Sequence, residues 1–372
     1  MPKSHVFRLD AAKFQADILR WYDKNRRVLP WRMTGKQKPD PYRVWLSEIM
    51  LQQTTVPAVI PYFEKFTQKW TDVHALAAAK DDDVMAAWAG LGYYARARNL
   101  LKCARVVSHD LGGKFPKTVD GLLELPGIGP YTAAAISAIV YGQGATVVDG
   151  NIERIVARVF AIDEPLPKGK VNIRASADLI FAGIEGMGKD HVMAYPQALM
   201  DIGADICSPK SPKCHLCPVQ SYCQAYQKGQ AGAYPVRAPK KDVPVRRGRV
   251  YWIENKKGQV LCEKRDSNRM LGGMRGLPTT DWDTQKIYDG EHLPLITPVA
   301  KSVRGVALLG RVVHVFTHFK LELEVWGVVL QNEQVVLKSN MEFLDIGYLD
   351  NVGFPTVFLK AARFAQRSFK KV

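Results

Sequence analysis

The stretch Leu122-Leu-Glu-Leu-Pro-Gly-Ile-Gly-Pro-Tyr-Thr132 decides how this chain folds, because it joins two apolar helical segments through paired glycines. Gly127 and Gly129 permit a positive φ and lack a Cβ atom, so phosphate oxygens can approach the backbone N–H groups. The helix expected from Pro130 adds the positive end of its dipole. The stretch predicts a sequence-independent grip on phosphate. Taken alone, it fits an ordinary helix–helix turn equally well.

Outward from this stretch, helical periodicity dominates residues 10–225. Ala-rich segments with apolar residues at helical spacing are divided by short Gly/Pro turns. We expect helices at Trp45–Leu51, Asp82–Ala89, Thr132–Val140 and Ile152–Phe160. Residues 226–248 then carry Gly, Pro and a basic run that includes Lys240 and Lys241, which indicates an exposed linker.

Beyond the linker, alternation of apolar and polar residues predicts strands. Arg249–Glu254 and Gln259–Lys264 flank a hairpin turn, and Arg311–Phe316 and Phe319–Leu330 form a second pair around Thr317-His318. Pro355 to Phe369 suggests a closing helix. We therefore expect an all-α domain over residues 1–225, a linker over 226–248 and an α+β domain over 249–372.

Composition favours a nucleic-acid partner. The chain has 372 residues, which suits two domains, and its formal charge of +16 gives a pI near 9.5. Charge alone fits a generally basic soluble protein equally well. No apolar run reaches the ~18 residues of a membrane span. The N-terminus lacks a signal-peptide pattern, so we expect a cytoplasmic protein with no membrane partner.

The cysteines indicate a metal site. Four of the six lie in the pattern Cys207-x6-Cys214-x2-Cys217-x5-Cys223. One close pair with two looser flanking ligands suits four thiolates around an iron–sulfur cubane. Structural zinc, which commonly uses two separated pairs, is the alternative. The cations of the loop between the ligands would face solvent or a phosphate.

Two carboxylates are candidates for acid–base chemistry. Glu48 lies on a predicted helix with largely apolar neighbours, where desolvation would raise its pKa toward that of a general acid. Pairing with Arg43 is the structural alternative. Asp149 precedes a predicted helix, where it is an N-cap whose ionised form the helix dipole favours. One protonated and one ionised carboxyl suit the cleavage of an N-glycosidic bond.

Together, and in this order, these features resemble the helix–hairpin–helix DNA glycosylase superfamily. Within it the chain is most similar to the adenine DNA glycosylase (MutY) family. Leu29–Arg32, Trp45–Thr54, Gly90–Asn99 and Phe316–His318 carry that similarity, which covers almost the whole chain and is weakest in the linker and at 280–300. The resemblance implies a [4Fe–4S] cluster on the four cysteines. It also implies a monomer that acts on duplex DNA containing adenine opposite 8-oxoguanine or guanine.

The resemblance also implies a role for each site residue. Glu48 would protonate adenine N7, and Asp149 would stabilise or trap the cationic sugar, with Tyr131 and Asn151 positioning both groups. Strand-nicking relatives carry a Lys nucleophile where this chain has Tyr131, so we expect a glycosylase without lyase activity. The remaining assignments concern DNA. The residues that would contact the duplex are Gly127, Ile128, Gly129, Leu51, Gln53 and Tyr93, and those that would line the adenine pocket are Trp31, Arg32 and Gln197.

The C-terminal part resembles the Nudix (MutT-like) fold. A working Nudix hydrolase needs an Arg-Glu-x2-Glu-Glu core for Mg²⁺, which residues 226–372 lack. We therefore expect a domain that recognises 8-oxoguanine, with Phe316, Thr317 and His318 touching the damaged base. The family usually has Ser at the position of Thr317, whose additional methyl stiffens χ1.

Three rival functions remain on the sequence alone. The first is an oxidised-pyrimidine glycosylase/lyase of the same fold, against which Tyr131 and the second domain count. The second is a non-catalytic iron–sulfur protein that binds DNA or senses redox state, which has no use for both Glu48 and Asp149. The third is Nudix hydrolysis by the C-terminal domain, which would require Mg²⁺-dependent nucleotide cleavage.

Overall fold

The computed structural model describes residues 9–32, 37–239, 242–266, 269–283, 303–330, 337–349 and 352–369. Lys240 and Lys241 of the predicted linker lie outside this range, as does most of 280–300. Contacts between Cα atoms divide the chain into two compact units. The first comprises residues 1–78 and 99–240, and the second comprises 79–98 and 241–372. The 79–98 segment thus groups with the C-terminal residues. In the part of the chain that the structure describes, no helix is long and apolar enough to cross a membrane.

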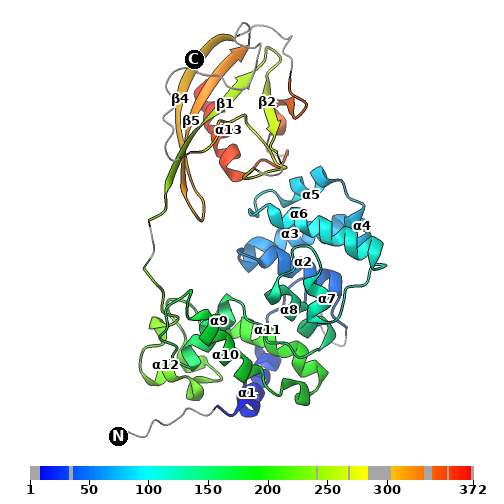
Figure 1. Ribbon diagram of the computed structural model, residues 1–372, viewed down its shortest axis with the longest axis vertical. Helices are drawn as coiled ribbons and strands as arrows, with labels where there is room; N and C mark the ends of the chain where they lie inside the picture. Colours follow the sequence, from blue (N-terminus) through cyan, green and yellow to red (C-terminus); the bar gives the residue numbers. More distant parts are fainter. Residues whose placement is uncertain are drawn as a thin grey trace. The chain divides into compact units, whose positions relative to one another are not determined.

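The first unit is helical (Figure 1). Its α-helices are α1 (Ala11–Asn25), α2 (Pro41–Leu51), α3 (Val56–Lys69), α4 (Val73–Ala77), α7 (Val119–Leu123), α8 (Pro130–Tyr141), α9 (Gly150–Val159), α10 (Lys170–Phe181), α11 (Lys189–Asp205) and α12 (Gln224–Gln227). Helix α6 (Ala95–Arg105) crosses the boundary between the two units. All four helices predicted from the sequence are present, with ends that differ by a few residues.

Short polar signals set the ends of the helices that carry the candidate site. Asp40 caps α2 by accepting from Tyr42 N, and Pro41 occupies the first turn. Pro130 begins α8, which ends at Gly142 in the left-handed conformation (φ 63°). Helix α8 is buried along almost its whole length and contacts both α2 and α11. The apolar helix after the glycine turn is therefore central to the packing of this unit.

The second unit contains α5 (Asp81–Trp88) and a mixed sheet closed by α13 (Thr356–Phe369). The strands are β1 (Val245–Glu254), β2 (Gln259–Lys264), β3 (Arg275–Gly276), β4 (Val303–Val315), β5 (Lys320–Leu330) and β6 (Met341–Asp345). Their order is β3-β2-β1-β5-β4, and β6 also pairs with β2. Strands β1 and β5 are parallel, whereas β4 and β5 form an antiparallel hairpin. Both predicted strand pairs and the closing helix are confirmed, although β1 begins within the segment predicted as linker.

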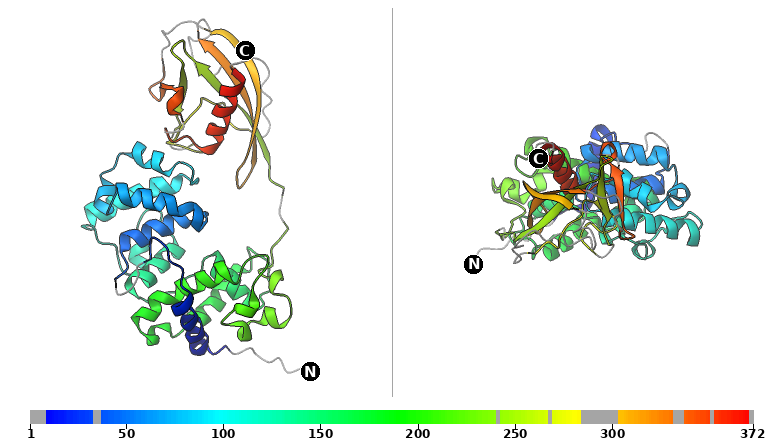
Figure 2. Two further views of the ribbon diagram at one scale, coloured as in Figure 1. Left: turned by 180° about the vertical axis from the view of Figure 1, so that it is seen from behind. Right: turned by 90° about the horizontal axis from the view of Figure 1, so that it is seen from above.

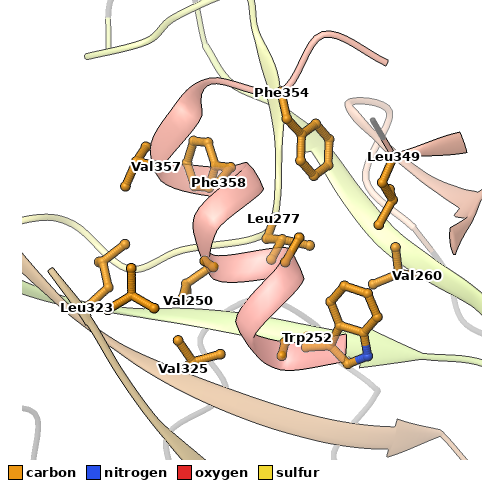
Figure 3. Close-up of a cluster of buried hydrophobic side chains, with 14 of the residues drawn as sticks. Val250, Trp252, Val260, Leu277, Leu323, Val325, Leu349, Phe354, Val357 and Phe358 are labelled. Carbon is orange, nitrogen blue, oxygen red and sulfur yellow. The ribbon is translucent and has the colours of Figure 1, made fainter. Parts of the chain in front are cut away.

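Burial on the sheet follows the predicted alternation. Leu321, Leu323 and Val325 of β5 are buried, while Glu322 and Glu324 point away from the core. Helix α13 crosses the apolar face (Figure 2), where Val357 and Phe358 are among the side chains that pack against Val250, Leu323 and Val325 (Figure 3). Each such fully buried side chain contributes about 1.5–3 kcal/mol relative to exposure.

Candidate active site

Glu48 lies on α2 and is 6% exposed. The Tyr131 hydroxyl, from the first turn of α8, donates a 2.7 Å hydrogen bond to Glu48 Oε2. Arg43, the structural alternative as partner of Glu48, instead donates to the Pro30 carbonyl at 2.7 Å. The prediction that Glu48 lies on a buried helix face is therefore confirmed. The side chain that hydrogen-bonds to Glu48 is a neutral phenol and not a cation.

The surroundings of Glu48 favour its neutral form. Burial raises the pKa of Glu48 to about 7, aided by the charge of Asp149 and opposed by the Tyr131 hydrogen bond and the Arg32 charge. Burial also raises the pKa of Tyr131 well above 10, so this phenol stays a hydrogen-bond donor. A carboxyl with a pKa near neutrality can both hold and deliver a proton under physiological conditions.

Asp149 is the N-cap of α9, as predicted. Its Oδ1 accepts from the backbone N–H groups of Asn151 (2.9 Å) and Ile152 (2.7 Å), and its Oδ2 accepts from Asn151 Nδ2 at 2.9 Å. The net pKa shift of Asp149 is upward, because burial outweighs these hydrogen bonds. The hydrogen bonds of the cap favour the carboxylate, as expected, but burial opposes them, and the net shift of the pKa is toward the neutral acid.

Two arginines that the sequence interpretation missed link α9 to the cysteine loop. Arg154 donates to Asn151 Oδ1 (2.9 Å), to the Gly203 carbonyl (2.6 Å) and to the Cys207 carbonyl (2.6 Å). Arg158 is 1% exposed and donates to Cys207 Sγ at 3.1 Å. Their i,i+4 spacing on a strongly amphipathic helix is the signal that could have indicated a shared buried partner.

The cysteine loop gathers all four predicted cluster ligands around one cavity. Among the described residues, no group of three His, Cys, Asp or Glu side chains could hold one metal ion. Cys207, Cys214, Cys217 and Cys223 nevertheless line one small cavity together with Arg158. Four thiol side chains that line one cavity are a donor set that suits a [4Fe–4S] cluster.

A cavity of about 260 Å³ opens beside Glu48. Its lining includes Trp31, Arg32, Leu51 and Gln197, which the sequence interpretation assigned to the adenine pocket or to DNA contact. The structure therefore brings these residues together with Glu48 around one volume. Gln197 donates its amide to Met193 one turn earlier on α11, so part of its hydrogen-bonding capacity is used within the helix.

The predicted DNA-contact residues have the expected backbone features only in part. Gly127 has φ 78°, but Gly129 is extended (φ −96°) and is the N-cap of α8. A Cβ atom on Gly129 would meet no other atom within 4 Å. The absence of a side chain here therefore leaves open space in front of the backbone N–H groups. Ile128 between them is 6% exposed. Gln53 is exposed and takes a positive φ of 59°, which is rare for residues other than glycine.

Tyr93 shows the same backbone feature in the second unit. Its φ is 49°, its side chain is 49% exposed, and its hydroxyl lies 2.7 Å from Thr317 Oγ1. Thr317 and His318 are both exposed in the tight turn between β4 and β5. Phe316 differs from them, because its ring stacks on that of Phe319, with 4.7 Å between the ring centroids, and packs against the core. The turn therefore presents two polar side chains on an anchored aromatic base.

Three family models match the chain. The model of the helix–hairpin–helix superfamily of base excision DNA repair proteins matches residues 46–179. The iron–sulfur binding domain of endonuclease III matches residues 207–223, and the NUDIX domain matches residues 249–363. These matches confirm the fold class and the cluster, and they remove the zinc alternative.

Curated relatives decide the family. The adenine DNA glycosylase of Homo sapiens is 32% identical over 392 residues, which cover 89% of this chain and 70% of that protein. The adenine DNA glycosylase of Buchnera aphidicola subsp. Baizongia pistaciae is 30% identical, with 93% of this chain and 95% of that protein covered. The chain belongs to the adenine DNA glycosylase family.

Membership of the adenine DNA glycosylase family makes this chain a DNA glycosylase, and therefore a hydrolase that acts in base excision repair. A solved thermostable thymine-DNA glycosylase is 31% identical, with a TM-score of 0.50 over 59% of this chain and 97% of that chain. The covered part of this chain is therefore similar in fold to another DNA glycosylase.

Proposed function

We propose that this enzyme excises adenine mispaired with 8-oxoguanine or guanine in duplex DNA and leaves the sugar–phosphate backbone intact. The observation that carries the proposal is the Tyr131–Glu48 hydrogen bond beside a cavity lined by Trp31 and Arg32. It supports the proposal because a carboxyl with a pKa of about 7 borders a cavity of about 260 Å³, which has room for a single base. The phenol of Tyr131 stands where the strand-nicking relatives are expected to have an amine.

The first step is extrusion of the adenine nucleotide, which costs a few kcal/mol because the base is inside the stack. Gln53, Leu51 and Tyr93 would fill or wedge the vacated space. Gly127, Ile128 and Gly129 would hold the backbone phosphates at the N-terminus of α8. Trp31, Arg32 and Gln197 would enclose the extruded base.

The chemical step is hydrolysis of the N-glycosidic bond. Glu48 would donate its proton to adenine N7, so that the C1′–N9 bond breaks with its electron pair moving to the base. Asp149, oriented by Asn151, would stabilise the oxocarbenium-like sugar or trap it before water adds at C1′. The products are adenine and an abasic site. Tyr131 holds Glu48 and supplies no amine for a Schiff base.

The C-terminal domain would read the opposite base. Thr317 and His318 project from the β4–β5 turn, and Phe316 supports the turn by stacking on Phe319. Cys207, Cys214, Cys217 and Cys223 would hold the [4Fe–4S] cluster, which cross-links the loop after α11. We further propose a cytoplasmic monomer, with the net charge of +16 supporting attraction to DNA.

The experiment that tests this proposal uses a labelled duplex holding adenine opposite 8-oxoguanine, split after incubation into samples with and without hot alkali. Strand breakage only after alkali is the expected result, because alkali cleaves abasic sites. Breakage without alkali would show lyase activity and contradict the assignment of Tyr131. An intact strand in both samples, with the duplex still bound, would favour the non-catalytic DNA-binding protein.

A further inference from the structure

Asp201 on α11 is a fully buried carboxylate (0% exposed) that the catalytic proposal does not use. It lies at the centre of a cluster with two arginines. Arg32 Nη1 donates to Asp201 Oδ2 at 2.7 Å and Arg32 Nη2 to Oδ1 at 2.9 Å, a bidentate pair. Arg27 Nε donates to Asp201 Oδ1 at 2.6 Å. A buried carboxylate is expensive without such partners, so its position requires an explanation.

Asp201 also binds both ends of one short segment. Besides its side chain, the Arg27 backbone N–H donates to Asp201 Oδ2 at 3.1 Å. Arg32, five residues later, binds Asp201 from the other end of the segment. The backbone N–H of Arg32 donates to the Leu29 carbonyl at 2.9 Å, which forms a turn. Trp31 lies between these anchors, with its ring in edge contact with Phe63 at 5.3 Å. Asp201 therefore fixes the segment that brings Trp31 and Arg32 into the cavity beside Glu48.

The charges in this cluster affect the pKa of Glu48. Arg32 and Glu48 line the same cavity, and the Arg32 charge lowers the pKa of Glu48. Burial lowers the pKa of Arg32, but the hydrogen bonds and charge of Asp201 more than compensate, so Arg32 stays a cation. An unpaired guanidinium here would stabilise ionised Glu48 more strongly, whereas the negative charge of Asp201, shared with Arg27, offsets part of the charge of Arg32.

We propose that Asp201 is a positioning residue for the adenine pocket, which holds the Arg27–Arg32 segment in place and offsets part of the charge of Arg32, so that Glu48 keeps its proton. This inference rests on the proposed function, in which Glu48 is the general acid. Asp201 contacts no reacting atom and acts only through Arg32. Tyr131 from α8 and Asp149 at the start of α9 also act on the pKa of Glu48. Tyr22, Arg26 and Arg27 line the same cavity. Asp190 of α11 also lines the cavity.

The test is the pH profile of adenine release under single-turnover conditions, measured between about pH 5 and pH 9 on the full-length enzyme. Asp201→Asn removes the negative charge and exposes Glu48 to uncompensated Arg32. The alkaline limb should move to lower pH by about one unit, which lowers the rate at about pH 8 roughly tenfold. Asp178→Asn is the matched control. It makes the same charge change in an exposed pair with Arg174 and should leave the limb unmoved.

A second variant gives the opposite sign. Arg32→Met removes the cation and leaves Asp201 paired with Arg27 alone, so the limb should move to higher pH even as adenine binding weakens. The double variant Asp201→Asn/Arg32→Met removes both charges and should bring the limb back toward its wild-type position. A merely structural disturbance would lower the rates at every pH without opposite displacements of the limb.

The outcomes separate the two proposals. A wild-type enzyme that releases no adenine would contradict the proposed function. A wild-type enzyme that releases adenine, with Asp201→Asn and Arg32→Met shifting the limb in the same direction or not at all, would overturn the role of Asp201 alone. If Asp201→Asn does not fold, Arg32→Met must still move the limb upward, and its failure to do so overturns the inference.

Discussion

The Tyr131 hydroxyl and the Glu48 carboxyl, 83 positions apart in the sequence, form a 2.7 Å hydrogen bond. Tyr131 stands in the first turn of α8, directly after the glycine turn, and Glu48 stands near the end of α2. The packing of α2 on α8 therefore connects the segment expected to grip phosphate with the expected general acid. Displacement of α8 would disturb both DNA contact and acid catalysis.

Glu48→Gln removes the transferable proton and keeps the shape of the side chain. We expect adenine release to slow by about 10²–10⁴-fold, while binding to the mismatched duplex stays within a few-fold of wild type. Single-turnover rates and equilibrium binding measure the two effects. Glu64→Gln on α3 makes the same change at an exposed position and should alter neither. Equal rates for Glu48→Gln and wild type would exclude Glu48 as the acid.

Tyr131→Phe tests the hydrogen bond from the other side. The phenol stabilises ionised Glu48 and so lowers its pKa, which stands at about 7. Removing the hydroxyl should move the alkaline limb of the pH–rate profile to higher pH. On the acidic plateau of the same profile, the rate of adenine release should fall by about fivefold, because one neutral hydrogen bond is lost. A limb displaced to lower pH would show that Tyr131 acts in another way.

Burial of Glu48 should lower the stability of the fold at neutral pH. The pKa of Glu48 rises from 4.5 to about 7 on folding, so the folded state holds the proton more tightly. The free energy of unfolding that protonated Glu48 contributes is fully present below about pH 4.5. It is lost between about pH 4.5 and pH 7 and is absent at higher pH. Glu48→Gln should therefore stabilise the fold by up to about 3 kcal/mol at pH 8 and by little at pH 4.

Thermal unfolding at several pH values measures this effect. The midpoint of Glu48→Gln should exceed that of wild type by several degrees at about pH 8, with the difference vanishing toward about pH 4. Glu64→Gln should show no pH-dependent difference. A Glu48→Gln midpoint below that of wild type throughout would mean that Glu48 contributes favourable contacts that outweigh its desolvation.

The two hairpin glycines should respond differently to alanine. Gly127 has φ 78°, and a Cβ atom there would lie 2.7 Å from Asn99 Cβ. Gly127→Ala should destabilise the enzyme by at least about 1 kcal/mol. Gly129 is extended with open space around it, so Gly129→Ala should fold normally and weaken DNA binding by obstructing the approach of phosphate. Unfolding curves and binding isotherms separate the two effects. Unchanged DNA binding in Gly129→Ala would exclude Gly129 as a residue that contacts DNA.

The local signals that determine secondary structure are readable in the sequence itself. Asp40-Pro41, Gly129-Pro130 and Asp149-Gly150 begin helices in the structure, because capping and a fixed proline φ depend only on neighbouring residues. The apolar face of β5 can also be predicted from the alternation over Lys320–Leu330, because successive side chains of a strand point to opposite faces of the sheet. Ordered motifs likewise determined the family and the cluster, since their spacing along the chain is itself the signal.

Tertiary structure alone decided which distant groups meet. Pairing Glu48 with Tyr131 and not with Arg43 depends on how α2 packs against α8. The bridge from Arg154 to the Cys207 carbonyl also required the fold. So did the burial of Asp201 between Arg27 and Arg32. Burial and long-range charge set the pKa values, and neither quantity is a property of a local stretch of sequence. The sequence therefore determined the elements and the chemistry available, and packing decided which side chains share a proton or a charge.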